Sequence, residues 1–384
     1  MKTVFFGPFI GEFGWELVYW QGWVKEVSKT IFKDCYKIVS SYPGRYPFYP
    51  YADEFWPHTQ EFTSILVSQR DYITDYWKNG LPKGNITVKK YRFGLYPYYK
   101  VIPYTTNEPR IDISNIVYTM LCSYKERLPE DTLYFMPFTL NKCPKYNIIF
   151  GTTIKANPIK DADFVTKKID LKYQALEKIS STKKGKDFLN KIVNKKNNLI
   201  AIFPRRRSVR RPDKNWAKDK YIKLIELLKN FLNGEYTIAL LGEPGGAYFD
   251  DTPLEDCLDL INISSEIRLD TQIAFLERAD LAIGGMSGAI LFALACGCPA
   301  LTFGFEEQRE RYYQENYLNT RFIYYPDINP EPEEIFDLAI GMLSKKIPPA
   351  NQKSWNPLDY FNSKFKIKKF FRSYFVERII NFTL

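Results

Sequence analysis

The chain has very little histidine: His58 is the only one among 384 residues. A single histidine excludes multi-histidine metal sites and leaves one position for a histidine base. His58 follows Trp56-Pro57 in a predicted loop, where a structural role is more common than a catalytic one. The cysteines show no metal-site spacing, so we expect buried free thiols and a reducing, cytoplasmic environment. They are Cys35, Cys122, Cys143, Cys257, Cys296 and Cys298.

Long apolar runs are also missing. No stretch reaches the roughly 18 apolar residues that a membrane-spanning helix needs. The N-terminus has no basic start followed by a long apolar segment, so no signal peptide is expected. Apolar residues nevertheless make up 45% of the chain, which is enough to bury ordinary cores. At roughly 150 residues per domain, the length predicts about two domains.

Acidic residues are in the minority, and the formal net charge is +10. A basic protein binds nucleic acid, an anionic membrane surface or phosphorylated small molecules. Nucleic-acid binding needs a basic stripe that extends over a face of the protein. The dense basic run at residues 203–216 does not recur elsewhere in the C-terminal half. We therefore expect no nucleic-acid partner and favour a phosphorylated small molecule.

Hydrophobic periodicity becomes regular from residue 198 onward. Strands are predicted at 198–203, 236–242, 258–264, 280–285 and 298–304, with helices at 218–232, 270–279 and 287–297. This alternation with short connections predicts an α/β fold with a parallel sheet and helices on both faces. A first strand is predicted around Val4-Phe5-Phe6. We divide the chain into Rossmann-like domains at 1–195 and 196–348, followed by a basic, aromatic helical tail at 349–384.

Residues 279–304 contain the strongest candidate site. A strand ends at Gly284-Gly285, Ser287 occupies the expected N-cap position, and Gly288 and Ala289 begin a helix. A helix N-terminus at the carboxyl edge of a parallel sheet is suited to a diphosphate, because free N–H groups and the helix dipole attract anions. The alternative interpretation is an ordinary capped helix.

The basic run is the second candidate. It follows the strand at 198–203 and carries five arginines and Lys214. Arginine forks match phosphate oxygens two at a time, so we expect Arg205, Arg207 and Lys214 to contact phosphate. The alternative is a solvated basic loop.

Further acidic and glycine-rich positions are weaker candidates. Gly242 and Glu243 lie in a loop that either binds a base or forms a plain turn. Glu306 either holds a pair of ribose hydroxyls or is a surface carboxylate. Asp161-Ala-Asp163 matches the Asp-x-Asp pattern of metal-dependent sugar transferases, but this pattern is common by chance and lies in a polar stretch. We therefore predict no metal site.

The N-terminal candidate site surrounds Glu12, which lies between Gly11 and Gly14 where the first strand leads into the first helix. A carboxylate at a helix N-terminus is stabilised in its charged form and can accept a proton. Glu12 is the predicted general base, and Glu16, one turn further on, is the second candidate. The glycines and Trp15 would contact the acceptor. The alternative is a glutamate that only stabilises the helix.

These residues resemble those of the two-Rossmann-domain (GT-B) glycosyltransferases, most closely the heptosyltransferase-like group of family 9. That group has a Gly-Asp pair where this chain has Gly11-Glu12, and the aspartate is the proposed base. Residues 279–304 follow the family order of strand, Gly/Ser-rich turn, small-residue helix, Gly-x-Pro strand and Phe-Gly, but lack the usual aspartate and histidine around the turn. A weaker likeness links 209–214 and Ser287 to the GDP-fucose-using α1,6-fucosyltransferase-like group, whose motif normally begins with a histidine that is absent here.

The resemblance implies two Rossmann-like domains facing across a cleft, with the C-terminal helix returning to the N-terminal domain. It implies an inverting, metal-independent and cofactor-free transfer from a GDP-, ADP- or UDP-linked sugar to a hydroxyl of a glycan or glycolipid. The donor would bind at 196–348 and the acceptor at 1–195. Two alternatives stay open: a sugar-nucleotide epimerase, which generally relies on histidine, and a non-catalytic nucleotide- or glycan-binding protein.

The C-terminal tail bears on the location of the protein. Residues 351–384 hold seven Lys or Arg against two acids, with aromatic residues interleaved. Such a helix either lies on an anionic membrane, which would suit a lipid-linked acceptor, or packs back on the N-terminal domain. We expect a cytoplasmic protein, and the first interpretation adds a peripheral contact at the inner membrane face.

Overall fold

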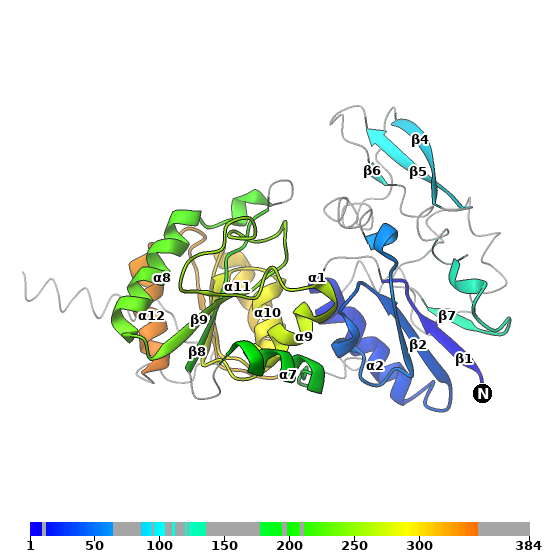
Figure 1. The fold of residues 1–384 in the computed structure, drawn as a ribbon, viewed down its shortest axis with the longest axis horizontal. Helices are drawn as coiled ribbons and strands as arrows, with labels where there is room; N and C mark the ends of the chain where they lie inside the picture. Colours follow the sequence, from blue (N-terminus) through cyan, green and yellow to red (C-terminus); the bar gives the residue numbers. More distant parts are fainter. Residues whose placement is uncertain are drawn as a thin grey trace, which may run out of the picture. The chain divides into compact units, whose positions relative to one another are not determined.

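The chain divides into two compact units (Figure 1). The first unit comprises Met1–Ile192 together with Asn262–Ala274, and the second unit comprises Val193–Ile261 and Phe275–Leu384. The computed structural model describes residues 1–9, 13–63, 86–93, 96–103, 110–111, 120, 123–135, 177–193, 198–207 and 211–344. The sequence-based division after residue 195 did not include the return of 262–274 to the first unit.

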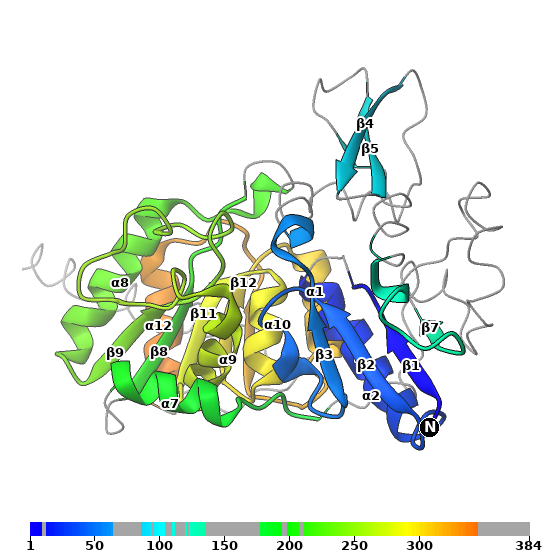
Figure 2. The same ribbon diagram turned by 45° about the vertical axis from the view of Figure 1, so that its right-hand side comes forward.

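The first unit contains a parallel sheet in the order β3-β2-β1-β7 (Figure 2). Its strands are β1 (Thr3–Phe6), β2 (Tyr36–Ser41), β3 (Glu54–Pro57) and β7 (Leu133–Phe135). Between β1 and β2 the chain forms α1 (Phe13–Trp15), a π-helical turn (Glu16–Trp20) and α2 (Gln21–Lys29). Large rings join α2 to the sheet: Trp23 lies 6.2 Å from Phe6, centroid to centroid, and both side chains are fully buried.

The first unit also includes shorter elements. A 3-10 turn (Tyr46–Phe48) follows β2, and α7 (Lys183–Ile192) lies late in this part of the chain. A separate antiparallel sheet has the order β4-β5-β6, formed by β4 (Ile86–Phe93), β5 (Tyr96–Pro103) and β6 (Arg110–Ile111).

A buried carboxylate explains why residues 262–274 belong to the first unit. Asp270 lies on α9 (Ser265–Leu276) and is fully buried. Its oxygens accept hydrogen bonds from the Thr182 backbone N–H (2.7 Å), the Thr182 hydroxyl and the Tyr46 hydroxyl (2.7 Å). A buried charge needs such partners because its desolvation is otherwise very costly. Asp270 therefore ties α9 to the start of α7 and to the turn after β2.

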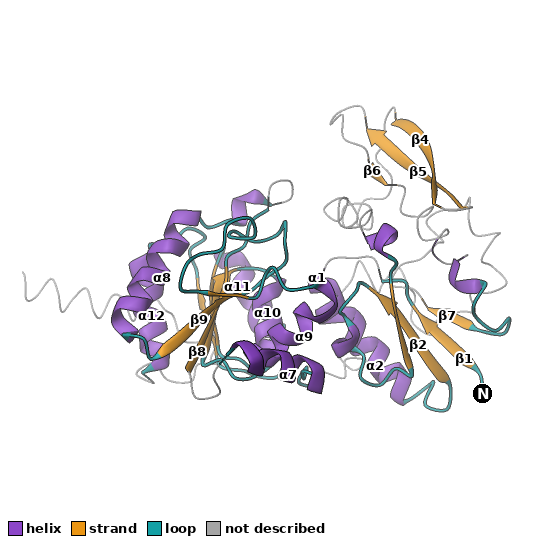
Figure 3. Cartoon of the chain, in the orientation of Figure 1, coloured by secondary structure: helices purple, strands orange, loops and turns teal. Residues whose placement is uncertain are grey.

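The second unit is built on a six-stranded parallel sheet in the order β10-β9-β8-β11-β12-β13. Figure 2 labels the strands β9, β8, β11 and β12, and Figure 3 distinguishes strands from helices by colour. The strands are β8 (Asn198–Phe203), β9 (Tyr236–Leu240), β10 (Leu258–Asp259), β11 (Leu281–Gly285), β12 (Ala300–Phe303) and β13 (Phe322–Tyr325). The helices are α8 (Lys218–Leu232), α10 (Gly288–Ala295), α11 (Arg309–Gln314) and α12 (Pro332–Leu343). The predicted parallel α/β architecture is confirmed. The strand predicted at 258–264 is shorter, and the helix predicted at 270–279 begins at Ser265.

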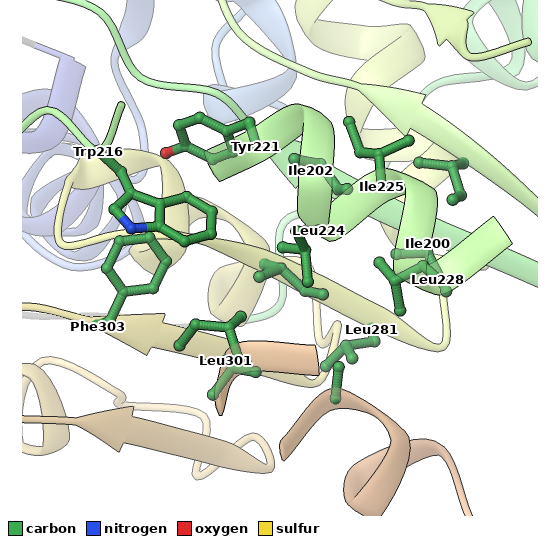
Figure 4. Close-up of a cluster of buried hydrophobic side chains, with 14 of the residues drawn as sticks. Ile200, Ile202, Trp216, Tyr221, Leu224, Ile225, Leu228, Leu281, Leu301 and Phe303 are labelled. Carbon is green, nitrogen blue, oxygen red and sulfur yellow. The ribbon is translucent and has the colours of Figure 1, made fainter. Parts of the chain in front are cut away.

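The two faces of this sheet carry side chains of different size. Large residues such as Ile202 and Leu281 belong to one buried cluster with residues of α8 and α12 (Figure 4). These two helices lie side by side (Figure 1). On the other face, small residues such as Ala282 and Gly284 alternate with them, and α10 packs there. A Cβ atom on Gly284 would lie 3.5 Å from Ile290 Cδ1 and 2.9 Å from Phe203 Cβ. The missing side chain therefore leaves room for Phe203 on the neighbouring strand β8.

Substitution of Gly284 tests this packing. A methyl group there would overlap Phe203 close to its backbone, so Gly284→Ala should lower the free energy of unfolding by about 1–3 kcal/mol in urea titrations. The neighbouring Gly285 offers a matched control, because its added Cβ would meet only ordinary contacts at 3.4 Å or more. Gly285→Ala should change the stability by less than about 0.5 kcal/mol. Equal effects of the two substitutions would contradict the packing argument.

Candidate functional site

Four of the predicted loops meet at the carboxyl edge of the second unit's sheet. β8, β9, β11 and β12 are parallel, so the segments that follow them leave the sheet at the same edge. These segments contain Arg205, Gly242, Ser287 and Glu306 respectively. The Tyr221 hydroxyl, on α8, donates to the carbonyl of Phe203 at the end of β8 (3.2 Å). Tertiary structure thus brings together residues that are up to 101 positions apart in sequence.

The basic loop after β8 is held by its own polar groups. Arg205 Nη1 donates to Asn215 Oδ1, and Arg205 Nη2 donates to the carbonyl of Arg211 (3.2 Å). The amide N–H of Arg207 also donates to Asn215 Oδ1 (3.0 Å). Arg211, in contrast, pairs with Asp213 (2.8 Å). The described part of the loop therefore has a defined conformation rather than being a freely solvated run of charges.

Positive charge accumulates at this edge. Burial and then the charge of Arg207 lower the pKa of Arg205 to about 10. Burial, followed by the charges of Arg211, Arg205 and Arg311, lowers the pKa of Lys214 to about 8. Both shifts mean that the surroundings disfavour further cations. A bound anion would relieve this repulsion.

The start of α10 provides a second feature suited to an anion. Ser287 is extended and directly precedes the helix, as expected for an N-cap, but its hydroxyl makes no capping hydrogen bond. The Ser287 Oγ atom is buried and has no hydrogen-bond partner among the described residues. Buried hydroxyl groups usually have a partner, so an unsatisfied one at a helix N-terminus is a candidate contact for an anionic ligand. Gly288 and Ala289 open the helix and are partly exposed.

The basic loop lies next to this helix start. A Cβ atom on Gly285, two residues before Ser287, would be 3.7 Å from the carbonyl oxygen of Lys214. The guanidinium carbon of Arg211 lies 5.6 Å from the ring centroid of Phe305, which follows β12. The segments after β8, β11 and β12 therefore converge on one region.

The two remaining candidate sites of the second unit are the loop at Gly242-Glu243 and the carboxylate of Glu306. Gly242 has a φ of 152°, and the amide N–H of Gly246 donates to the Glu243 carbonyl (3.0 Å), so this loop contains a tight turn. The Glu306 side chain is 62% exposed and pairs with Arg309 at 3.4 Å. Roles of these residues in binding a base or a ribose stay predictions.

The first unit places the N-terminal candidates differently. Gly11 and Glu12 lie outside the described residues, whereas Gly14 and Trp15 belong to α1. Glu16 begins the π-helical turn and is fully buried. Its carboxylate accepts hydrogen bonds from the hydroxyl groups of Ser41 and Tyr49 (2.6 Å for Tyr49) and from Arg45 Nη1 (3.0 Å). Burial, and then the Glu16 charge, raises the pKa of Tyr49 well above its usual value.

These contacts give Glu16 a clear structural task. It joins the π-helical turn to β2 and to the segment that follows β2, through an ion pair whose arginine is also buried. The Arg45 guanidinium lies 4.4 Å from the ring centroid of Phe13. Glu16 as an alternative base stays a prediction.

His58 lies in the core of the first unit and is only 2% exposed. Its Nε2 atom is 2.7 Å from the Phe9 carbonyl oxygen, and Nδ1 is 3.2 Å from the Tyr124 hydroxyl. Because a carbonyl only accepts hydrogen bonds, Nε2 carries the proton. Burial lowers the pKa of His58 to about 4, so the ring is neutral at pH 7. The environment supports a structural role.

The other sequence-based expectations are tested only in part. The described cysteines, Cys35, Cys257, Cys296 and Cys298, are free as expected. In the part of the chain that the structure describes, no helix is long and apolar enough to cross a bilayer, and no group of three or more metal-ligating side chains occurs. Asp161, Asp163 and the tail at 349–384 lie outside the described residues.

Comparison with known proteins identifies solved structures with a similar fold. No protein-family model and no curated protein sequence matches the chain. Among solved structures, a family 9 glycosyltransferase from Veillonella parvula covers 90% of this chain and 97% of its own, with 10% identity and a TM-score of 0.50. The chain has the fold of a family 9 glycosyltransferase. The predicted fold-level resemblance to the GT-B enzymes is thereby confirmed, while the facing of the two units across a cleft stays a prediction.

Two Escherichia coli heptosyltransferases match with slightly lower scores. ADP-heptose lipopolysaccharide heptosyltransferase II has a TM-score of 0.48 and 12% identity, covering 90% of this chain and 99% of its own. A heptosyltransferase structure with ADP has a TM-score of 0.47 and 10% identity, covering 91% and 100%.

Sequence reasoning missed several polar residues of this GT-B-like chain. Asn215 and Arg311 lie at the basic edge of the second unit, and Arg45 pairs with Glu16 in the first. Asn215 directly follows the singled-out Lys214, which was the available signal. Arg45 had no such signal, because it lies 29 positions from its partner Glu16.

The buried His58 predicts a specific pH dependence of stability. The unfolded chain binds a proton at the histidine below about pH 6.5, but the folded chain does so only below about pH 4. The contribution of the neutral His58 ring to the free energy of unfolding is therefore fully present above pH 6.5 and is lost as the pH falls from 6.5 toward 4. We expect a loss of about 2 kcal/mol in the free energy of unfolding between pH 7.5 and 5.

The control is His58→Gln, which removes the only histidine. This variant should be less stable at all pH values, but its stability should fall less over the same pH range. Identical pH dependence in the variant and the wild type would contradict the assignment of a neutral buried ring.

Proposed function

We propose that this protein is a glycosyltransferase that moves a sugar from a nucleotide-diphosphate sugar to a hydroxyl of a glycan or glycolipid, with inversion and without a metal ion. The observation that carries the proposal is the convergence of the basic loop and the start of α10, where the buried Ser287 hydroxyl has no partner among the described residues. The family 9 fold supports the same class of reaction by analogy.

The chemistry follows from where charge develops. Cleavage of the sugar–phosphate bond leaves a diphosphate whose negative charge grows in the transition state. Arg205 and Lys214 supply positive charge, and the first N–H groups of α10 and the Ser287 hydroxyl supply hydrogen bonds. Preorganised groups of this kind stabilise a developing anion strongly, because they need no reorganisation during the reaction. These residues would do the work that a divalent cation does in metal-dependent transferases.

Removal of the acceptor proton needs a base, and Glu12 is the proposed one. It directly precedes α1 in the first unit, where Gly14 and Trp15 are the proposed acceptor contacts. The Glu16 carboxylate is less suited to this task, because Ser41, Arg45 and Tyr49 already surround it in a buried environment. A base must also be able to reach the proton that it removes.

Binding of nucleoside diphosphates tests the donor site. The loss of a charge-assisted hydrogen bond costs about 1.5–3 kcal/mol, so Arg205→Ala should weaken binding of GDP, ADP or UDP about tenfold or more in calorimetry. Ser287→Ala should weaken it about threefold to tenfold. Lys229→Ala, in the last turn of α8, removes a cation away from this edge and should have no effect. Unchanged affinity in both site variants would overturn the donor-site assignment.

Turnover separates the proposed function from its alternatives. The protein is incubated with a panel of nucleotide sugars, and nucleoside diphosphate release and donor epimerisation are followed together. Release supports the transferase, whereas conversion of the sugar without release indicates an epimerase. Binding without either reaction indicates a non-catalytic protein.

Substitution of the two N-terminal glutamates tests the base. A positioned base contributes about 10²–10⁴-fold in rate, so Glu12→Gln should lower turnover by that factor with donor affinity and thermal stability unchanged. Glu16→Gln should instead destabilise the first unit by about 3–5 kcal/mol, because it leaves the buried Arg45 without its counter-charge. If Glu12→Gln keeps its turnover and a fully folded Glu16→Gln loses it, the base is Glu16.

A further inference from the structure

One neutral side chain connects the two ends of the basic loop. Asn215 Oδ1 accepts hydrogen bonds from Arg205 Nη1 and from the Arg207 amide N–H (3.0 Å). Asn215 Nδ2 donates to the Arg207 carbonyl (2.7 Å). The side-chain amide thus pairs with both backbone groups of Arg207 and also fixes the guanidinium of Arg205. Its segment is itself anchored, because the neighbouring Trp216 is fully buried and donates to the Pro330 carbonyl (3.0 Å).

The chemical type of the partners matters as much as their position. The Arg205 guanidinium donates to two acceptors among the described residues, Asn215 Oδ1 and the main-chain carbonyl of Arg211, and both are uncharged. An aspartate at position 215 would also accept from Arg205, but it would neutralise the guanidinium and repel a phosphate. An amide orients the cation and leaves its charge available, together with the N–H groups that are not engaged.

The like charges in the basic loop explain why Arg205 needs a fixed hydrogen-bond partner such as Asn215. Arg205, Arg207, Arg211 and Lys214 lie within one short loop, and their mutual repulsion contributes to the lowered pKa of Arg205 and of Lys214. Without a cross-link, the long side chain of Arg205 would sample conformations that keep it away from the other cations. Ordering it upon ligand binding would then cost conformational entropy.

We infer that Asn215 is a positioning residue of the anion site, which holds Arg205 in its binding conformation without neutralising it. The inference rests on the proposed function, because it assumes that Arg205 contacts the donor diphosphate. It assigns to Asn215 a role in affinity for the diphosphate rather than a direct contact with the ligand.

The first test measures binding of GDP, ADP and UDP by calorimetry. Asn215→Ala should weaken binding about threefold to tenfold. In an Arg205→Ala background the same substitution should change affinity by less than about twofold, because the two residues act through one interaction. Asn215→Asp should weaken binding more than Asn215→Ala, because its charge would neutralise Arg205 and repel the phosphate. Asn198→Ala, an exposed asparagine at the opposite end of β8, is the matched control and should bind as the wild type does.

The second test needs no ligand. Hydrogen exchange of the Arg207 amide should be slow in the wild type and at least about tenfold faster in Asn215→Ala, since its acceptor is removed. Unchanged exchange, or a loss of affinity that is equally large in the Arg205→Ala background, would overturn the inference. If the wild type binds nucleoside diphosphates and Asn215→Ala binds them equally well, only the inference fails. If the wild type binds none of the three, the proposed function fails and the inference with it.

Discussion

Parallel pairing of β8 with β11 is the constraint on which the candidate site depends. The register sets Ile202 opposite Ile283 and Phe203 opposite Gly284, so both strands end at the same edge. The basic loop and the start of α10 therefore both leave the sheet there. Gly284 on one face leaves room for the Phe203 side chain of the neighbouring strand, and the large residues on the other face pack against α8 and α12. Close packing of the sheet thus determines where the charged groups lie.

The two units use buried polar groups for different purposes. In the first unit, the carboxylates of Glu16 and Asp270 each accept three hydrogen bonds and join segments that are distant in sequence. Such charges are tolerated in a core only because their partners compensate for lost hydration. At the carboxyl edge of the second unit, Arg205 and Lys214 have no carboxylate partner among the described residues, and Ser287 lacks any partner there. Together with the accumulated positive charge, the Ser287 hydroxyl, unpartnered within the described part of the chain, is consistent with the proposed anion site at this edge.

Neutral hydrogen-bond partners hold the basic loop in place and at the same time leave its positive charge unneutralised. A loop with several arginines is easily held in place by carboxylates, but these would compete with the proposed phosphate ligand. The carbonyl of Arg211 and the amide of Asn215 hold Arg205 with dipoles only, so orientation is obtained without charge neutralisation. The energetic cost is visible in the pKa of Lys214, which burial and neighbouring arginines lower to about 8. A diphosphate would offset that cost upon binding.

Local periodicity by itself determined several strands and helices of the second unit. The strand at 198–203 and the helix at 218–232 have the predicted bounds, because alternating or helically spaced apolar residues must face a core wherever it lies. The sequence also predicted which loops follow the strands, and hence the candidate phosphate contacts. Only the tertiary structure decided the pairing of polar groups. Glu16 finds Tyr49 33 positions away, Thr182 finds Asp270 88 positions away, and the Ser287 hydroxyl does not cap its own helix. Such pairs depend on how whole elements pack, and short-range patterns carry no information about that.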